Sequence, residues 1–511
     1  MTTHPVLSRV VFGIDAYPVA VECRISSGLP RTTIVGLPEG AVRESRDRVA
    51  SALQAAGFAY PRGKVIINLA PGNITKAASF LDLPIAISVL IASEQLPQER
   101  LHQYEWIGEL GLESQLRATQ GSLLCAIAAR DNKRILIAPS SAQREIAPVQ
   151  GMLNNVCFVN NLIDAAHILT QGHSVDGSIP EPSRFERHNT GTRAKHVGTY
   201  EQVIGQHAAK EALKVAAAGG HHLLMVGPPG AGKTMLARSL AELMPDPTPN
   251  EHLQIASIYS SNHLVPPSCR PFREPHHSAS TAALLGGGRV PQAGDAALAH
   301  LGVLFLDELP HFKPSVLNNL REPLESGEVT LSRVGYRVTY PCRFQLVAAM
   351  NPCPSGYSCK EHSCRCTQQE VQRYQGRISG PLLDRIDLQV PVREVAHKEL
   401  MAPTAERSDL KHVRTRIAEA VATQYQRQNK SNALLTAQEI RSEIEKTKLS
   451  PAISAAIEKR EYSARATHKL WKVARTIADL SGQKHIGEEH LLQAVSYRGL
   501  DWQAGLGLSP R

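Results

Sequence analysis

Short apolar runs alternate with segments of helical spacing along the first third of the chain. The runs typical of strands are Val10–Phe12, Ala20–Ile25 and Lys64–Asn68, and the segments typical of helices are Gly40–Ala56 and Pro84–Ser93. An alternation of period-two and period-3.6 patterns over this length predicts an α/β domain, which we expect to cover residues 1–172.

The pattern changes twice further along the chain. Residues 173–198 are polar and poor in large apolar side chains, so they predict a linker. Apolar strand patterns return over residues 199–395, whereas residues 396–511 have helical spacing throughout. The sequence therefore predicts an α/β chain in which a second α/β domain is followed by a helical one.

A complete phosphate-binding loop follows the strand pattern Leu223–Val226. Its residues are Gly227, Pro228, Pro229, Gly230, Ala231, Gly232, Lys233 and Thr234, and a helical run comes next. The glycines let backbone N–H groups turn toward phosphates, and the start of the helix adds partial positive charge. We expect Lys233 to reach the β- and γ-phosphates and the Thr234 hydroxyl to ligate Mg²⁺. The loop therefore predicts binding of a nucleoside triphosphate.

Polar side chains follow two later strand patterns. Asp307 and Glu308 come directly after the apolar run Val303–Leu306, and Asn351 ends the run Phe344–Met350. Beside a phosphate-binding loop, Asp307 is suited to hold Mg²⁺, Glu308 to act as the base on the attacking water, and Asn351 to orient that water. The alternatives are an acidic helix cap and an Asn that ends a strand in a turn.

Arg385 stands in the sequence Leu-Leu-Asp-Arg-Ile-Asp at residues 382–387. An arginine there is suited to stabilise the charge that develops on a γ-phosphate, as an arginine finger. A finger that acts on a neighbour's nucleotide requires a ring of subunits. The alternative is a surface ion pair between an Asp and Arg385, which would contribute little.

The order of these motifs resembles the AAA+ ATPases. Further segments make the chain similar to the bacterial magnesium-chelatase-like group called YifB or ComM, namely Gly36–Pro38, Phe80–Ala86, Phe272–Ser278, Gly286–Gly288, Phe305–Pro310 and Val473–Leu480. The resemblance covers nearly the whole chain. It implies an ATP- and Mg²⁺-dependent DNA helicase that assembles as a homohexamer and assists natural transformation by branch migration.

The resemblance also implies that the N-terminal domain has the fold of the Lon protease catalytic domain. Ser79 and Lys76 are present, but the glycines that flank the serine in Lon and a matching downstream lysine are not. We therefore expect a domain without proteolytic activity that serves as a scaffold or in ring assembly. The stretches Pro275–Thr281 and Gly286–Arg289 lack a helical period, and we expect them to belong to a flexible loop that faces a pore.

Residues 327–340 alternate apolar and polar positions around Gly335 and predict a β-hairpin. Arg333 and Arg337 lie near its tip and are candidates to contact DNA phosphates, and Tyr336 is a candidate to stack on a base. Related motors place such a hairpin in the pore. The alternative is a solvated hairpin with a packing tyrosine.

Two further sets of residues are candidates for ligand binding. Arg465 opens a helical run and matches the position that senses nucleotide from the C-terminal helical lid, with a solvated arginine as the alternative. Four cysteines, Cys353, Cys359, Cys364 and Cys366, fall in one loop and are candidates to hold structural Zn²⁺. Their spacing differs from the usual Cys-x₂-Cys pairs, so reduced thiols are the alternative.

Composition changes this picture little. Lys and Arg exceed Asp and Glu by 56 to 47, a net charge of +9 that is compatible with DNA as a partner but does not establish it. No apolar run reaches the roughly 18–20 residues that span a membrane, and no signal peptide is evident, so a cytoplasmic location is expected. Two functions stay open: a ring-shaped DNA motor, and a magnesium-chelatase-like motor that remodels a protein partner without touching DNA.

Overall fold

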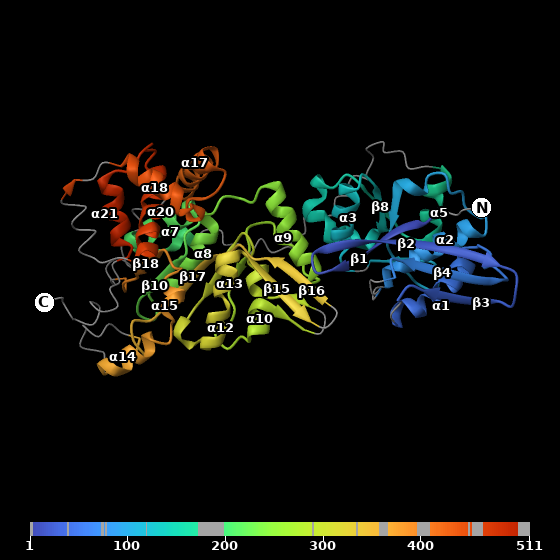
Figure 1. Cartoon of the computed structure of the whole chain (residues 1–511), viewed down its shortest axis with the longest axis horizontal. Coiled ribbons are helices and arrows are strands. Elements are labelled where there is room, and N and C mark those ends of the chain that lie inside the picture. Colours follow the sequence, from blue (N-terminus) through green and yellow to red (C-terminus); the bar gives the residue numbers. More distant parts are fainter. Residues whose placement is uncertain are drawn as a thin grey trace. The chain divides into compact units, whose positions relative to one another are not determined.

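A computed structural model describes residues 4–37, 40–72, 76, 79–118, 120–171, 199–288, 291–333, 336–356, 366–395, 409–447, 450–451 and 463–498. The chain divides into two compact units, one formed by residues 1–191 with 248–268 and the other by residues 192–247 with 269–511 (Figure 1). No helix in the described part of the chain is long and apolar enough to cross a bilayer.

The first unit contains a four-stranded sheet of order β1-β2-β4-β3, in which only the β3–β4 pair is parallel. The strands are β1 (Val6–Phe12), β2 (Asp15–Ser26), β3 (Arg31–Val35) and β4 (Lys64–Ala70). Val65, Ile67 and Leu69 of β4 are buried in alternation with more exposed neighbours, which explains the period-two pattern of this segment. The alternation of strands and helices that the sequence predicts here is confirmed.

A second, parallel sheet of order β5-β8-β9 lies in the same unit. The buried Arg9 of β1 and Glu105 of β5 form an ion pair, with 2.5 Å between Nε and Oε2. The remaining elements of the first unit are β5 (Tyr104–Trp106), β6 (Glu109–Leu110), β7 (Leu116–Arg117), β8 (Ile135–Pro139), β9 (Val156–Val159), α1 (Gly40–Ala55), α2 (Asp82–Ala92), α3 (Ser122–Asp131), α4 (Gln143–Ile146), α5 (Leu162–Gln171) and α9 (Pro249–Ser261).

Helix α9 is distant in sequence from the rest of this unit. It lies between the phosphate-binding loop and the acidic pair in sequence, yet it packs against α3. Its Leu253 and Ala256 belong to the hydrophobic core of the first unit, and the Ser260 hydroxyl donates to the carboxylate of Glu145. The segment 248–268 is therefore an arm of the second α/β segment that is built into the first unit.

The second unit is organised around a five-stranded sheet of order β11-β14-β17-β10-β18, and all four strand pairs are parallel. Its strands are β10 (Leu223–Val226), β11 (Phe272–Arg273), β14 (Val303–Leu306), β17 (Gln345–Met350) and β18 (Leu388–Pro391). Strands β14 and β17 are buried along their whole length, as the continuous apolar runs indicate. Because the strands are parallel, the segments that follow them meet at one edge.

The second unit also contains helices and two antiparallel strand pairs. The hairpin strands are β15 (Glu328–Arg333) and β16 (Tyr336–Pro341), and a second short pair is β12 (Gly286–Gly287) with β13 (Gln292–Ala293). The helices are α6 (Thr199–Gln202), α7 (His207–Gly219), α8 (Lys233–Leu243), α10 (Thr281–Leu285), α11 (Asp295–Leu298), α12 (Pro314–Asn319), α13 (Arg321–Ser326), α14 (Gln368–Gln375), α15 (Gly380–Leu383), α17 (Leu410–Gln428), α18 (Ala437–Lys446), α20 (Ala464–Leu480) and α21 (Glu488–Ser496).

Candidate nucleotide-binding site

The phosphate-binding loop connects β10 to α8, as the sequence predicts. Gly230 and Gly232 adopt φ angles of +76° and +85°, which residues other than glycine rarely adopt. Gly232 stands directly before the first residue of α8, so the backbone turns into the helix at this point. The loop therefore presents the N-terminus of an eleven-residue helix at the carboxyl edge of the sheet.

Lys233 connects the loop to the neighbouring strand. Its Nζ donates to the carbonyl oxygens of Gly227 and Pro228, at 2.8 Å each, and to Oδ1 of Asn351 at 2.9 Å. Asn351 follows β17, which pairs with β10, so the sheet order brings the two side chains together. The pKa of Lys233 is lowered because the side chain is buried, and the nearby Asp307 and Glu308 offset this shift only in part. The lysine and the strand-end amide are thus parts of one site.

Asp307 lies on the other side of the same site. Its Oδ2 accepts from the Thr234 hydroxyl at 3.2 Å, and its Oδ1 accepts from the backbone N–H of Glu308 at 2.8 Å. A hydroxyl and a carboxylate at this separation are the hard oxygen donors that Mg²⁺ prefers. The predicted Mg²⁺ ligands therefore lie together and fit the ion by their chemistry.

Glu308 has an unusual backbone conformation. Its φ of +52° lies in the left-handed region, where a residue other than glycine is strained. Its side chain is 53% exposed, and Oε2 lies 3.1 Å from Nδ1 of His277. The candidate base thus projects from the end of β14 with its carboxylate held by a histidine.

His277 lies in the segment that we expect to form a flexible pore-facing loop, and it is a further residue of the nucleotide-binding site. The short strand β11 pairs in parallel with β14, so the segment after β11 starts at the same edge as Glu308. The rings of His276 and His277 lie 4.1 Å apart, and His311 lies 6.0 Å from His277. Strand β11 has only two residues, so the sequence shows no alternation that would predict it. The His-His pair that follows it is the only sequence feature that indicates a site there.

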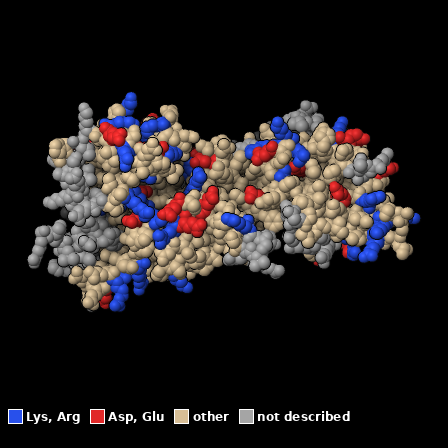
Figure 2. Space-filling model, in the orientation of Figure 1, with Lys and Arg blue, Asp and Glu red and all other residues tan. Residues whose placement is uncertain are grey.

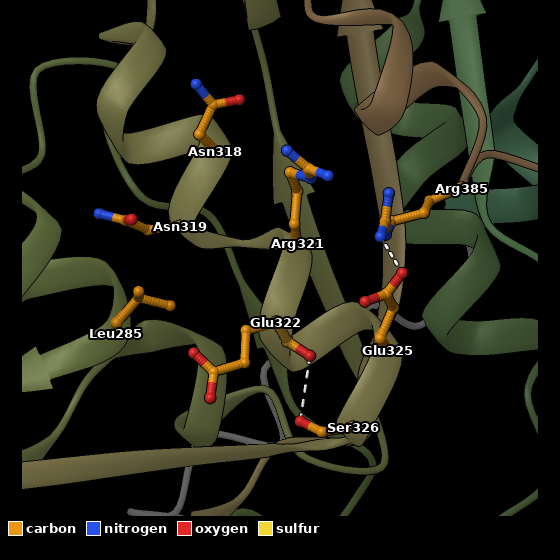
Figure 3. A pocket seen from close by; sticks show the side chains of 8 residues that line it. All are labelled: Leu285, Asn318, Asn319, Arg321, Glu322, Glu325, Ser326 and Arg385. Atoms are coloured by element: carbon orange, nitrogen blue, oxygen red, sulfur yellow. Dashed lines mark hydrogen bonds and ion pairs between the residues drawn. The ribbon is translucent and has the colours of Figure 1, made fainter.

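Arg385 lines a pocket of about 400 Å³ beside α13, together with residues of α12 and α13. Figure 3 shows its guanidinium directed at Glu325, with which it forms an ion pair. The acid that Arg385 contacts is this glutamate of α13, and not the aspartate of the alternative prediction. Arg321 lines the same pocket.

The remaining candidate residues are partly outside the described structure. Arg337 is exposed on β16, and the side chains of Arg333 and Tyr336 lie outside the described part. Arg465 is exposed in the first turn of α20. Their predicted roles stay predictions.

The zinc prediction is equally untested. Cys353 is buried and Cys366 is partly exposed, whereas Cys359 and Cys364 lie outside the described residues. Within the described residues, no group of three or more His, Cys, Asp or Glu side chains could hold a metal ion.

Three family models match separate segments of the chain. A family model described as magnesium chelatase, subunit ChlI, matches residues 199–400, and one described as subunit ChlI of Mg-chelatase matches residues 21–142. A third, described as magnesium chelatase, subunit ChlI C-terminal, matches residues 407–498. The matched segments thus include the sheet, the phosphate-binding loop and the helices after Leu410.

Individual relatives extend over the full length. The chain is 41% identical over 512 residues to a protein of Escherichia coli called uncharacterized protein YifB, with 98% of each chain covered. It is also 41% identical over 507 residues to competence protein ComM of Haemophilus influenzae, again with 98% of each covered. The magnesium-chelatase 67 kDa subunit of Chlorobaculum parvum is 27% identical over 200 residues, which is 38% of this chain.

A parallel sheet, a phosphate-binding loop and magnesium-chelatase family matches together define a P-loop protein of the AAA+ type. More narrowly, the chain belongs to the YifB/ComM family of magnesium-chelatase-like proteins. Family membership supports ATPase activity and the use of ATP and Mg²⁺.

Proposed function

We propose that this protein is a ring-forming ATPase that couples ATP hydrolysis to movement of DNA through branch migration. The observation that carries the proposal is the joint arrangement of Lys233, Asn351, Thr234 and Asp307 in a chain that aligns end to end with a competence protein. Competence is the capacity to take up DNA, so a family motor with an ATPase site is suited to process the incoming strand.

The residues of the site divide the work of hydrolysis. Lys233 exchanges the loop carbonyls for the β- and γ-phosphate oxygens, and its positive charge stabilises them. Glu308 takes a proton from the attacking water, which Asn351 orients. Mg²⁺ would be held by Thr234 and Asp307, and it would neutralise charge on the β- and γ-phosphates.

DNA contact is assigned to the β15–β16 hairpin. Lys, Arg, Asp and Glu side chains are intermixed over the face drawn in Figure 2, so a single basic surface does not account for DNA binding there. The hairpin instead offers Arg337, exposed on β16, and Arg333, directly opposite Tyr336 in the strand register. Arginines bind phosphate without regard to sequence, and a tyrosine stacks on any base.

The other parts of the proposal concern assembly. Arg385 acts on the nucleotide of the next subunit in a homohexamer, and Arg465 senses nucleotide from a C-terminal helical lid. The first unit has a Lon-like fold without proteolytic activity and serves as a scaffold. Lys76 there is buried and donates to the carbonyl of Pro71, while Ser79 lies at the start of a 3₁₀ turn, its side chain outside the described part.

Replacing both hairpin arginines tests the DNA part of the proposal. We expect Arg333→Ala/Arg337→Ala to weaken binding to all DNA sequences and to reduce branch migration. Each lost phosphate contact should lower the slope of log affinity against log salt by roughly 0.7–0.9, because fewer counterions are released. Titration of labelled forked DNA at several salt concentrations measures this slope.

A control variant separates specific contact from loss of charge. Lys411→Ala/Arg441→Ala removes two exposed cations from α17 and α18 and should change the slope less. Equal slopes for the hairpin variant and the parent protein would show that the hairpin is not the contact. If DNA also fails to stimulate the parent ATPase, the helicase proposal is lost, and a motor that remodels a protein partner takes its place.

The contact between His277 and Glu308 leads to a second prediction. His277→Ala should lower kcat about ten-fold while the affinity for nucleotide stays within about two-fold, because the base loses the imidazole contact that orients it. His277→Asn should recover part of the rate, since its amide N–H can replace the Nδ1 donor. Steady-state ATPase assays and fluorescent-nucleotide titrations give the two quantities.

The neighbouring histidine is the matched control for this experiment. The Nδ1 of His276 lies 2.7 Å from the Ser278 hydroxyl and not against Glu308, so His276→Ala should have the smaller effect on kcat. Equal losses in the two alanine variants would mean that the His-His segment acts through packing alone.

A further inference from the structure

The pocket beside α13 holds a second set of charged side chains outside the nucleotide-binding loop. Arg321, Glu322 and Glu325 reach it from α13, and Arg385 reaches it from the segment after α15 (Figure 3). Two cations and two anions line a volume of about 400 Å³, so the pocket has no formal net charge from these groups. An anionic ligand would therefore meet two acids there as well as two arginines.

Arg385 is held tightly within its own subunit. Its Nη1 donates to the carbonyl oxygen of Pro381 at 2.5 Å, and its Nη2 forms the ion pair with Glu325. The Arg385 side chain is 12% exposed. In this position the guanidinium cannot extend far from the surface toward a phosphate on another molecule.

One donor of this guanidinium is unmatched. The Nε of Arg385 is buried and has no hydrogen-bond partner in the described structure. Buried donors are nearly always paired, so this one indicates a guanidinium that is not in its only functional position. After release from Glu325, Nε and Nη2 together present the two parallel N–H groups that bind a phosphate in bidentate fashion.

The ion pair between Glu325 and Arg385 is suited to break. The Glu325 side chain is 62% exposed, and ion pairs with such solvent access contribute little stability. A triphosphate terminus carries more negative charge than one carboxylate and presents several oxygens to the guanidinium. Arg385 can therefore exchange the carboxylate of Glu325 for a phosphate that approaches its guanidinium.

We propose that Glu325 is a latch, which holds Arg385 within the subunit until the terminal phosphate of a nucleotide bound to a second copy of this chain displaces it. The inference rests on the proposed function, because it takes Arg385 as the residue that acts across the subunit boundary. It adds that the isolated subunit opposes assembly through one ion pair. Glu325 is a positioning residue in this account and does not touch the nucleotide.

The dependence of ATPase activity on protein concentration tests the latch. In Glu325→Gln the ion pair is lost, so assembly should compete with a weaker internal contact. We expect the protein concentration that gives half-maximal specific activity to fall roughly two- to five-fold, as suits a partly exposed ion pair. The affinity of the isolated site for fluorescent ATP should match that of the parent protein.

Glu322→Gln is the matched control, since it removes the same charge from the same helix and pocket without breaking the ion pair to Arg385. Its shift should be clearly smaller than that of Glu325→Gln. Glu325→Asp keeps the charge on a shorter side chain and should shift the half-maximal concentration in the same direction as Glu325→Gln. It thus provides the test if the glutamine variant fails to fold.

The outcomes separate this inference from the proposed function. If Arg385→Ala is inactive but neither Glu325 variant lowers the half-maximal concentration below that of Glu322→Gln, the latch is wrong and the finger stands. If Arg385→Ala hydrolyses ATP at the parent rate, the proposed action across the boundary fails, and the latch fails with it.

Discussion

Glu308→Gln should bind ATP with near-parental affinity and hydrolyse it at least about a hundred-fold more slowly. The amide keeps the size and the hydrogen-bonding reach of the carboxylate but cannot accept a proton from water. General-base catalysis typically contributes about 10² to 10⁴ in rate, so the loss should lie in that range. Single-turnover hydrolysis with excess protein measures the chemical step directly.

Lys233→Ala is the contrasting variant for this experiment. It removes the cation that contacts Gly227, Pro228 and Asn351, so nucleotide binding itself should be lost. A Glu308→Gln protein that hydrolyses ATP near the parental rate would exclude Glu308 as the base. The direct contact of Glu308 with His277 would then make the histidine the next group to test.

The parts of the fold that were predictable have strong local patterns. The strand Leu223–Val226, the glycine-rich loop and the helix from Lys233 follow each other in sequence, and each is dictated by the residues at its own positions. The buried strands β14 and β17 are apolar except for Gln345 at the start of β17, and each is followed by a polar side chain. Parallel pairing then brings Asp307 and Asn351 to the same edge without further information.

The parts that were not predictable depend on contacts between distant segments. Strand β11 has two residues, and its pairing with β14 is what places His277 beside Glu308. Helix α9 lies between the loop and the acidic pair in sequence, and no local pattern shows that it packs on α3. Glu325 likewise carries no motif, and only the tertiary structure pairs it with Arg385.

The residues suited to contact the nucleotide lie in sequence motifs, whereas the residues that position them are found only in the structure. The sequence predicts the roles of Lys233, Asp307 and Asn351, because their chemistry requires fixed positions after strands. His277 and Glu325 act through another side chain, so many residue types at many positions could serve. Their identification required the distance to Glu308 and the ion pair with Arg385.

Arg385→Ala should be inactive alone and should recover activity when mixed with Lys233→Ala protein. In a mixed ring, some boundaries combine an intact nucleotide site on one subunit with an intact Arg385 on its neighbour. An arginine finger is worth roughly 10³ to 10⁵ in rate, so even a minority of such boundaries should give measurable turnover. Only an arginine that acts on the adjacent subunit's nucleotide allows this recovery.

The mixing experiment requires that neither variant loses the ability to associate. Equimolar Arg385→Ala and Lys233→Ala should show turnover that rises with mixing and vanishes when both changes are placed in one chain, since no boundary then retains either group. Arg321→Ala is the matched control in this series. Arg321 lines the same pocket as Arg385, but the ion pair with Glu325 is made by Arg385. Absence of recovery, in mixtures that co-assemble by light scattering, would mean that Arg385 serves its own subunit, as a structural cation of the α13 pocket.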